Sequence, residues 1–101
     1  MRAEFGKPDL PFVIATAGMT SAGEEPAPYS GYTDVERAQL WVFPESPKPA
    51  KVLSSDTRGF WEDAAVSPRD QGNHWNGNAR SYFRVGKALG DDMVELLAPT
   101  P

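Results

Sequence analysis

The stretch LPFVIATA, residues 10–17, decides the fold class. It is an almost continuous apolar run between Pro8 and Gly18, too short to span a membrane. A short run that does not alternate is typical of a strand buried on both faces, as in a parallel sheet. Periodicity alone also allows a buried helix segment. The stretch favours an α/β protein in which this segment is an inner strand.

A loop, a helix and a second strand follow along the chain. Residues 18–31 are small, polar and rich in Gly and Pro, which predicts a loop and a candidate binding loop. Residues 33–43 predict a helix, because Thr33 and Glu36 have capping-box spacing and Val35, Ala38 and Val42 fall on one face. Pro44 is expected to end it, and residues 51–55 predict a short second strand.

The clearest element is the last helix, capped by Asn76 or Asn78 and running to about Leu97. Its apolar residues recur at spacings of three and four, which predicts one stripe facing a sheet. They are Ala79, Tyr82, Phe83, Gly86, Leu89, Met93, Leu96 and Leu97. Gly86 and Gly90 lie on or beside this stripe and are expected to let the helix approach the sheet closely.

The order strand, helix, strand, helix favours an α/β layer with parallel strands. Two strands alone do not make a stable sheet. We therefore expect residues 1–101 to be part of a larger domain, or to need a partner or self-association. Uncovered strand edges and apolar faces predict poor stability of the chain by itself.

Composition excludes several classes of function. The chain has 101 residues, a net charge of −4 and a pI near 4.8, which argues against a surface for nucleic acid or an anionic membrane. It has no cysteine, which excludes disulfides and thiol nucleophiles, and a single histidine, which makes a zinc site unfavourable. We expect no metal and no cofactor.

The segment SPRDQGNHWNGNA, residues 67–79, holds the residues that can carry chemistry. His74 stands on a loop after a strand and immediately before a helix, where many α/β hydrolytic enzymes place a base. Active sites of open α/β sheets gather beyond the carboxyl ends of the strands. The alternative is a surface or helix-capping histidine, and spacing alone favours that alternative.

Residues 67–97, SPRDQGNHWNGNARSYFRVGKALGDDMVELL, resemble the C-terminal block of the sialate O-acetylesterase-like and acetylxylan esterase-like SGNH hydrolases. In that family a Gln-Gly-x-His-Trp-Asn motif opens the last helix and a Tyr-Phe-x-x-Gly pattern continues it. The stretches LPFVIATAGM, VERAQL and KVLSSDTRGFW resemble earlier elements in the same order. The resemblance implies the C-terminal segment of a single esterase domain with a three-layer α/β/α, flavodoxin-like fold and parallel strands.

The resemblance implies hydrolysis of an ester, usually deacetylation of a sugar, by a serine nucleophile for which His74 is the general base. The family's serine block and its oxyanion-hole blocks are not recognisable in this chain. Six serines lack the required context, and none of them is proposed as the nucleophile. They are Ser21, Ser30, Ser54, Ser55, Ser67 and Ser81. We therefore expect the 101-residue chain to be inactive by itself.

The sequence allows more than one acidic partner for His74. Many SGNH hydrolases place an aspartate three residues before the histidine, but Gln71 occupies that position here, and Asp70 lies one residue earlier. Asp70 is the candidate; its alternative is a solvated loop carboxylate that pairs with Arg69 or caps a turn. Asp56 is a second candidate, for which an Asx-turn at a strand end is favoured. A serine–histidine dyad oriented by a backbone carbonyl is a further option.

Trp75 and Asn76 are predicted to contact a carbohydrate substrate, through a flat aromatic face and an amide. Trp61 and Asn78 are weaker candidates. The competing interpretations are packing of Trp75 against the core and helix capping by an asparagine. Two other functions stay open, a noncatalytic carbohydrate-binding or interaction remnant and a truncated gene product. The family is often secreted or periplasmic, but the sequence does not fix the compartment.

Overall fold

The computed structural model describes residues 1–19, 31–41 and 47–99. Strand β1 (Phe12–Ala15) is followed by helix α1 (Tyr32–Gln39), strand β2 (Val52–Ser55) and helix α2 (Ala79–Leu97), with short 3-10 turns between β2 and α2. The strands pair in parallel with Phe12 opposite Val52 and Ala15 opposite Ser55. The predicted order of elements and the parallel pairing are confirmed: the described residues form a mixed α/β structure with a two-stranded parallel sheet and two helices.

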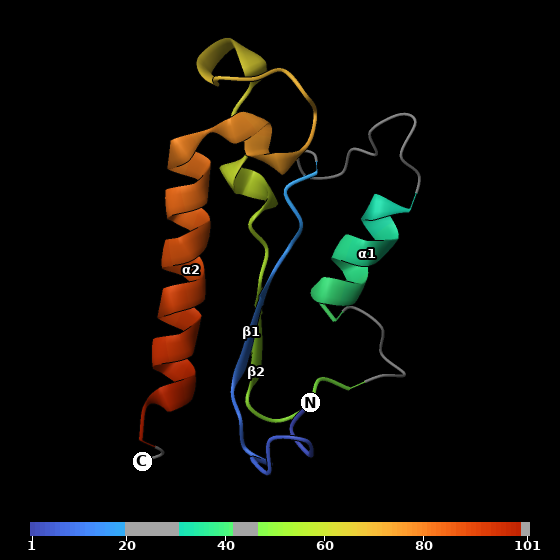
Figure 1. The fold of residues 1–101 in the computed structure, drawn as a ribbon, viewed down its shortest axis with the longest axis vertical. Coiled ribbons are helices and arrows are strands. Elements are labelled where there is room, and N and C mark those ends of the chain that lie inside the picture. Colours follow the sequence, from blue (N-terminus) through green and yellow to red (C-terminus); the bar gives the residue numbers. More distant parts are fainter. Residues whose placement is uncertain (20–30, 42–46, 100–101) are drawn as a thin grey trace.

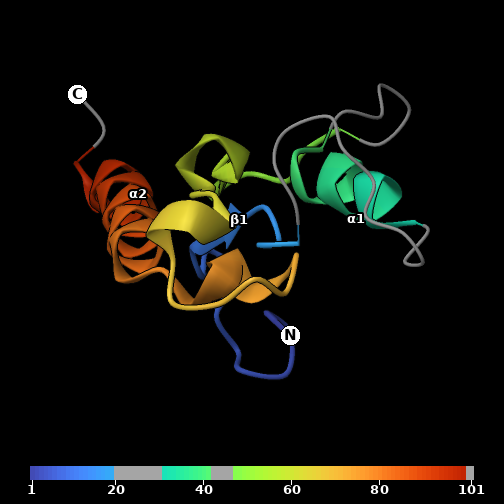
Figure 2. The same ribbon diagram turned by 90° about the horizontal axis from the view of Figure 1, so that it is seen from above.

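The two helices lie on opposite sides of the strands (Figures 1 and 2). Helix α2 contacts both strands, and the Ser55 hydroxyl donates to Asp92 Oδ2 at 2.6 Å. On the opposite face, the strands line an apolar groove of about 390 Å³ whose wall includes Phe12, Ile14 and Val52. All eight strand residues are only half-buried. The expected burial of residues 10–17 on both faces is therefore partial.

Helix α1 differs from the prediction in its start and in its inner face. Its N-cap is Gly31, in the left-handed region at φ 93°, with no side-chain cap, so the Thr33 capping box was wrong. Val35 is exposed, whereas Glu36 is buried and its carboxylate lies 3.6 Å from Arg58. An ion pair thus turns a polar side of α1 inward. The helix ends at Gln39 with Leu40 as its C-cap, so the predicted end at Phe43 before Pro44 was also wrong. Val42 and most of the loop 18–31 lie outside the described residues.

Helix α2 begins as predicted, because Asn78 is its N-cap and its Oδ1 accepts from the amides of Arg80 and Ser81. The predicted single stripe was wrong. Leu89, Met93 and Leu96 are partly buried, but Tyr82, Phe83 and Leu97 are exposed.

The glycines of α2 also differ from the expectation. A Cβ built at Gly86 or Gly90 would meet no atom within 4 Å, so neither glycine lies against the sheet. The residues that turn inward include Ser81 and Asp92, which are hydrogen-bonded to Phe60 O and to Ser55. These bonds fix the rotation of the helix and leave a second apolar side outside.

The best-buried part of the described structure is polar. Trp75 is the one fully buried hydrophobic residue among the described residues, at 5% exposure. The other buried residues among those described are polar: Thr16, Glu36, Thr57, Asn76, Asn78 and Ser81. Buried polar groups are stable only when they are hydrogen-bonded. The order of this molecule therefore depends on hydrogen bonds near the carboxyl ends of the strands.

Candidate functional site around His74

The backbone from His74 to Gly77 is left-handed. The φ angles are 47° at His74, 56° at Trp75, 49° at Asn76 and 68° at Gly77. For residues with a side chain this region costs about 1–2 kcal/mol each. Such strain persists only where the surrounding structure enforces it, and it clusters at functional sites. The contacts that enforce this backbone conformation therefore indicate which side chain the turn positions.

Trp75 anchors the turn to the end of β1. Its amide donates to Gly18 O at 3.2 Å, and its indole lies directly against Gly18. A side chain at Gly18 would overlap the indole ring, so only glycine fits there. The ring of Trp61 packs at 6.2 Å from that of Trp75, centroid to centroid. The burial of Trp75 supports its interpretation as a packing residue, and its predicted substrate contact stays a prediction.

Asn76 holds the loop from inside. Its Oδ1 accepts from the amides of Gln71 and Gly72, both at 3.1 Å, and its Nδ2 donates to Glu62 O at 3.3 Å. Its own carbonyl accepts from Arg69 N at 3.1 Å. Asparagine also tolerates the left-handed region better than most residues. The described contacts of Asn76 are thus internal to the loop, and a role toward a substrate stays a prediction.

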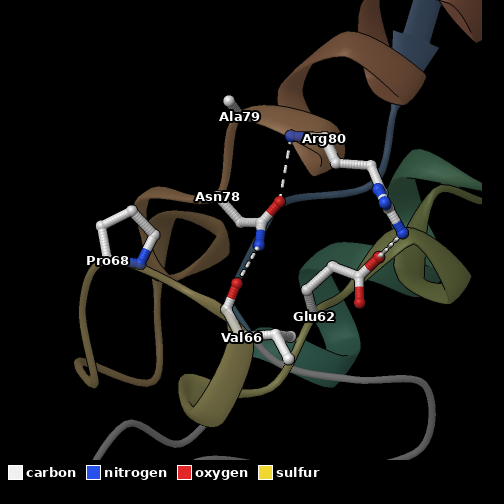
Figure 3. Close-up of a pocket in the computed structure, with 6 residues that line it drawn as sticks. All are labelled: Glu62, Val66, Pro68, Asn78, Ala79 and Arg80. Atoms are coloured by element: carbon white, nitrogen blue, oxygen red, sulfur yellow. Dashed lines mark hydrogen bonds and ion pairs between the residues drawn. The ribbon is translucent and has the colours of Figure 1, made fainter.

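Asn78 joins the turn to α2. Its Nδ2 donates to Val66 O at 3.1 Å while its Oδ1 caps the helix (Figure 3). A surface cavity of about 470 Å³ lies beside Asn78. Glu62 and Arg80 line it and point toward each other (Figure 3), and their charged groups are 3.9 Å apart. His74 is not among the residues that line this cavity. The cavity therefore belongs to the base of the loop rather than to the histidine.

Thr16 and Thr57 tie the carboxyl ends of the strands together beneath the loop. Thr57 N donates to Thr16 Oγ1 at 2.9 Å, and the Thr57 hydroxyl donates to Thr16 O at 3.1 Å. The two hydroxyls lie 3.0 Å apart, so the Thr16 hydroxyl is the remaining donor between them. Both residues are buried. This reciprocal pair fixes the platform on which the turn stands.

His74 is the exposed residue of this turn. Its carbonyl accepts from the Tyr82 hydroxyl at 2.8 Å, which ties it to the first turn of α2. Within residues 1–19, 31–41 and 47–99, the imidazole forms no hydrogen bond or ion pair. The turn lies beyond the carboxyl ends of the parallel strands (Figure 1). A fixed backbone thus carries a free imidazole at the edge where α/β active sites gather.

The two candidate carboxylates have different surroundings. Asp56 is engaged by Arg58, whose Nε and Nη2 donate to its two oxygens at 2.8 and 2.6 Å. The Arg58 side-chain hydrogen bond holds the pKa of Asp56 below its usual range. The amide of Arg58 also donates to Asp56 Oδ1, which is the Asx-turn that the alternative interpretation expected. Asp70 is exposed, and among the described residues its carboxylate has no partner.

The described serines have structural contacts or none. Ser67 donates to Glu62 O and Ser81 to Phe60 O, while Ser55 donates to Asp92 and the Ser54 hydroxyl is buried without a partner. None of these four is hydrogen-bonded to His74, and Ser21, Ser30 and Ser46 lie outside the described residues. The described part of the chain therefore offers no activated serine.

Metal sites and membrane-spanning helices find no support in the described ranges. No three His, Cys, Asp or Glu side chains there come together as a metal ion would require. No described helix is long and apolar enough to cross a membrane. Comparisons with protein families, curated proteins and solved structures find no match to this chain. The function of this chain is therefore inferred from the loop that carries His74 and from the motifs of the sequence.

The sequence singles out His74, Trp75 and Asn76 as candidates and correctly predicts the cap Asn78, but it does not indicate which residues hold this turn. Gly18 was noted only as the end of an apolar run, and Thr16 and Thr57 were not singled out. A glycine directly after a buried strand is a signal for close approach of another group. The threonines carry no such signal, since their pairing depends on the register of the two strands.

Proposed function

We propose that this chain contributes the general base, His74, to a serine-type ester hydrolase that removes acetyl groups from carbohydrates. In this proposal the chain is the C-terminal part of a three-layer α/β/α domain of the SGNH type. One structural observation carries it. An exposed imidazole stands on a strained, internally locked turn beyond the carboxyl ends of two parallel strands. The motifs at residues 67–97 supply the reaction class.

The strain of the turn supports a catalytic use of His74. A general base must be held within hydrogen-bond reach of the proton that it takes, and small misplacements lower the rate strongly. Trp75 and Asn76 fix the backbone on one side of the imidazole, and the Tyr82 hydroxyl holds the His74 carbonyl. An imidazole can take and return a proton near neutral pH. A simple surface histidine would not need this support.

The proposal assigns a role to each loop residue. His74 takes the proton of the serine hydroxyl and returns it to the leaving sugar alcohol. Asp70 is the carboxylate available to orient the imidazole, because Asp56 is already bound by Arg58. A backbone carbonyl is the alternative partner. The serine and the oxyanion donors are supplied by sequence outside these 101 residues, and Trp75 and Asn76 support the turn.

The test is kinetic and uses a version of the protein in which a Gly-x-Ser block precedes this segment. His74→Ala should lower the turnover of an acetylated sugar by at least about a thousandfold, because base and nucleophile act as a unit. Asp70→Ala should cost far less if a backbone carbonyl orients the ring. Asp56→Ala is the control carboxylate and should change turnover little. If His74→Ala kept more than roughly a tenth of the activity, less than about 1.4 kcal/mol of barrier, His74 would not be the base.

The 101-residue chain provides a second test. It should hydrolyse an activated acetyl ester no faster than free imidazole does, since no described serine is hydrogen-bonded to the imidazole of His74. Rates are compared between the wild-type chain and single Ser→Ala variants. A faster rate that one such variant abolishes would show that this chain holds its own nucleophile.

A further inference from the structure

The outer side of α2 carries an apolar stripe that nothing in the described structure covers. Phe83, Val94 and Leu97 are 73%, 71% and 65% exposed. At about 100° per residue, positions 83, 90, 94 and 97 fall within about 60° of one another and span about 21 Å of the helix. Figure 2 shows the strands on the inner side of α2 and no described element on its outer side. The stripe therefore faces away from the sheet.

The charges of α2 are arranged against its macrodipole. The N-terminal half carries three cations, Arg80, Arg84 and Lys87, and the first turn has no acid. The C-terminal half carries three acids, Asp91, Asp92 and Glu95, and the last turn has no base. Acids are stabilising near a helix N-terminus and cations near a C-terminus. An isolated α2 is destabilised by this order. Within the chain, Arg84 lies 3.3 Å from Glu62 and Lys87 lies 2.6 Å from Asp91, which offsets part of this cost. The acidic half of the helix still ends without a cation in its last turn.

The glycines on this side of α2 also indicate a surface on which another helix packs. Each glycine in a helix interior costs about 1 kcal/mol relative to alanine. Gly86 and Gly90 have no packing reason within the described structure, because a Cβ at either position would meet no atom within 4 Å. A second helix laid on the stripe would use the missing side chains for close approach.

We propose that two copies of this chain associate through an antiparallel pairing of their α2 helices along Phe83, Gly90, Val94 and Leu97. In this arrangement Phe83 of one copy lies beside Leu97 of the other, with the two-fold axis near Gly90. The cationic half of each helix then lies along the acidic half of the other, on the flank that carries Arg84, Lys87, Asp91 and Glu95. Antiparallel macrodipoles add to this match. A parallel pairing would place like charges together.

Charge complementarity favours a second copy over an unrelated partner. Each α2 helix carries both a cationic half and an acidic half, so two antiparallel copies complement each other. The stripe is short compared with the roughly 800 Å² per partner of a standard interface. The expected dimer is therefore weak and depends on protein concentration. The stripe faces away from the sheet, so the pairing does not depend on the proposed role of His74.

Sedimentation velocity measures the pairing of the 101-residue chain. The concentration range is about 5 to 500 μM, because a small interface is expected to associate weakly. The sedimentation coefficient should rise from monomer toward dimer over this range. Phe83→Lys should weaken association by at least about tenfold, because it replaces the largest apolar side chain of the stripe with a charged one. Phe5→Lys is the matched control, because Phe5 is another exposed phenylalanine, at 64%, outside α2. A chain that stays monomeric, or a dimer that Phe83→Lys leaves intact, overturns the proposal.

Two further variants separate this pairing from other modes of association. Glu95→Lys should weaken the dimer while raising the melting midpoint of the dilute monomer, since it brings a cation to the helix C-terminus. Orientation is measured by oxidative crosslinking, for which the absence of cysteine in the chain is convenient. Phe83→Cys and Leu97→Cys should crosslink when the two variants are mixed, and neither should crosslink with itself. Self-crosslinking of Phe83→Cys with no mixed product overturns the antiparallel arrangement.

Discussion

The two ends of the sheet are stabilised differently. At the carboxyl end, Thr16 and Thr57 bond each other, Asn76 and Asn78 bond backbone groups of the loop, and the loop above them is held in a strained turn. At the amino end, apolar strand residues border an open groove, and Arg2 covers them by donating to Leu10 O at 2.9 Å and lying 5.6 Å from the Phe12 ring centre. Hydrogen bonds demand specific geometry, whereas half-covered apolar surface does not. The contrast indicates that geometry is fixed most strictly around His74.

The largest effect is expected at Gly18, where the carboxyl end has no spare room. Gly18→Ala places a methyl group inside the Trp75 indole and should destabilise the chain by on the order of 2–3 kcal/mol, as overpacking does. Gly59→Ala is the matched control, because its Cβ would meet no atom within 4 Å. Urea unfolding followed by tryptophan fluorescence measures both. Equal midpoints for the two variants would mean that Trp75 does not anchor the loop.

A smaller loss is expected when the hydrogen bonds of the loop are removed. Asn76→Ala leaves the amides of Gln71 and Gly72 without their acceptor and should cost about 1–3 kcal/mol. Asn73→Ala is the control from the same loop, since the Asn73 side chain has no hydrogen bond in the described residues. The same unfolding measurement compares them. If Asn73→Ala were as destabilising as Asn76→Ala, the buried amide would not be what holds the turn.

The sequence predicted the features of the fold that depend on neighbouring residues, and it did not predict those that depend on contacts between distant residues. Local signals gave the order of elements, the Asn78 cap and the segment that carries His74, because capping and apolar runs act over a few residues. The inner faces of both helices were mispredicted. Glu36 turns inward to meet Arg58, and Asp92 turns inward to meet Ser55, and both partners are distant in sequence. Hydrophobic periodicity does not contain such pairs.

The left-handed turn could not be predicted either. His74, Trp75 and Asn76 have no special preference as a run for positive φ, and Gly77 alone would indicate a single turn position. The turn exists because Gly18, Glu62 and Arg69 supply partners from elsewhere in the chain. Tertiary contacts override local preference here, which is the pattern expected at functional sites.

The smallest effect is expected at the ion pair on the rim of the carboxyl end. The pKa of Asp56 is lowered in the folded state by its hydrogen bond to Arg58. Its contribution to stability is therefore complete above its ordinary value of 3.8 and is lost as pH falls through the lower folded-state pKa. The pair is partly exposed, so the contribution should stay below about 1 kcal/mol. Asp56→Asn should be slightly less stable than the wild-type chain at neutral pH.

The pH dependence of that difference is the check. Urea midpoints of the wild-type chain and of Asp56→Asn should converge as the pH is lowered below about 3.8. Asp63→Asn, at an exposed aspartate, serves as the control for general effects of charge. A difference that grew toward acid pH would show that the ion pair does not contribute in this way.

Residue-resolved amide hydrogen exchange tests most directly the claim that the loop carrying His74 is the most strictly held part of the molecule. The amides of Gln71, Gly72 and Asn78 should be protected by at least about a hundredfold over a free peptide, because buried or loop acceptors hold them. Those of the N-terminal segment before β1 should exchange much faster. Asn76→Ala should remove the protection at Gln71 and Gly72 and leave that in the middle of α2 unchanged. Free-peptide exchange rates at Gln71 and Gly72 in the wild-type chain would contradict the account.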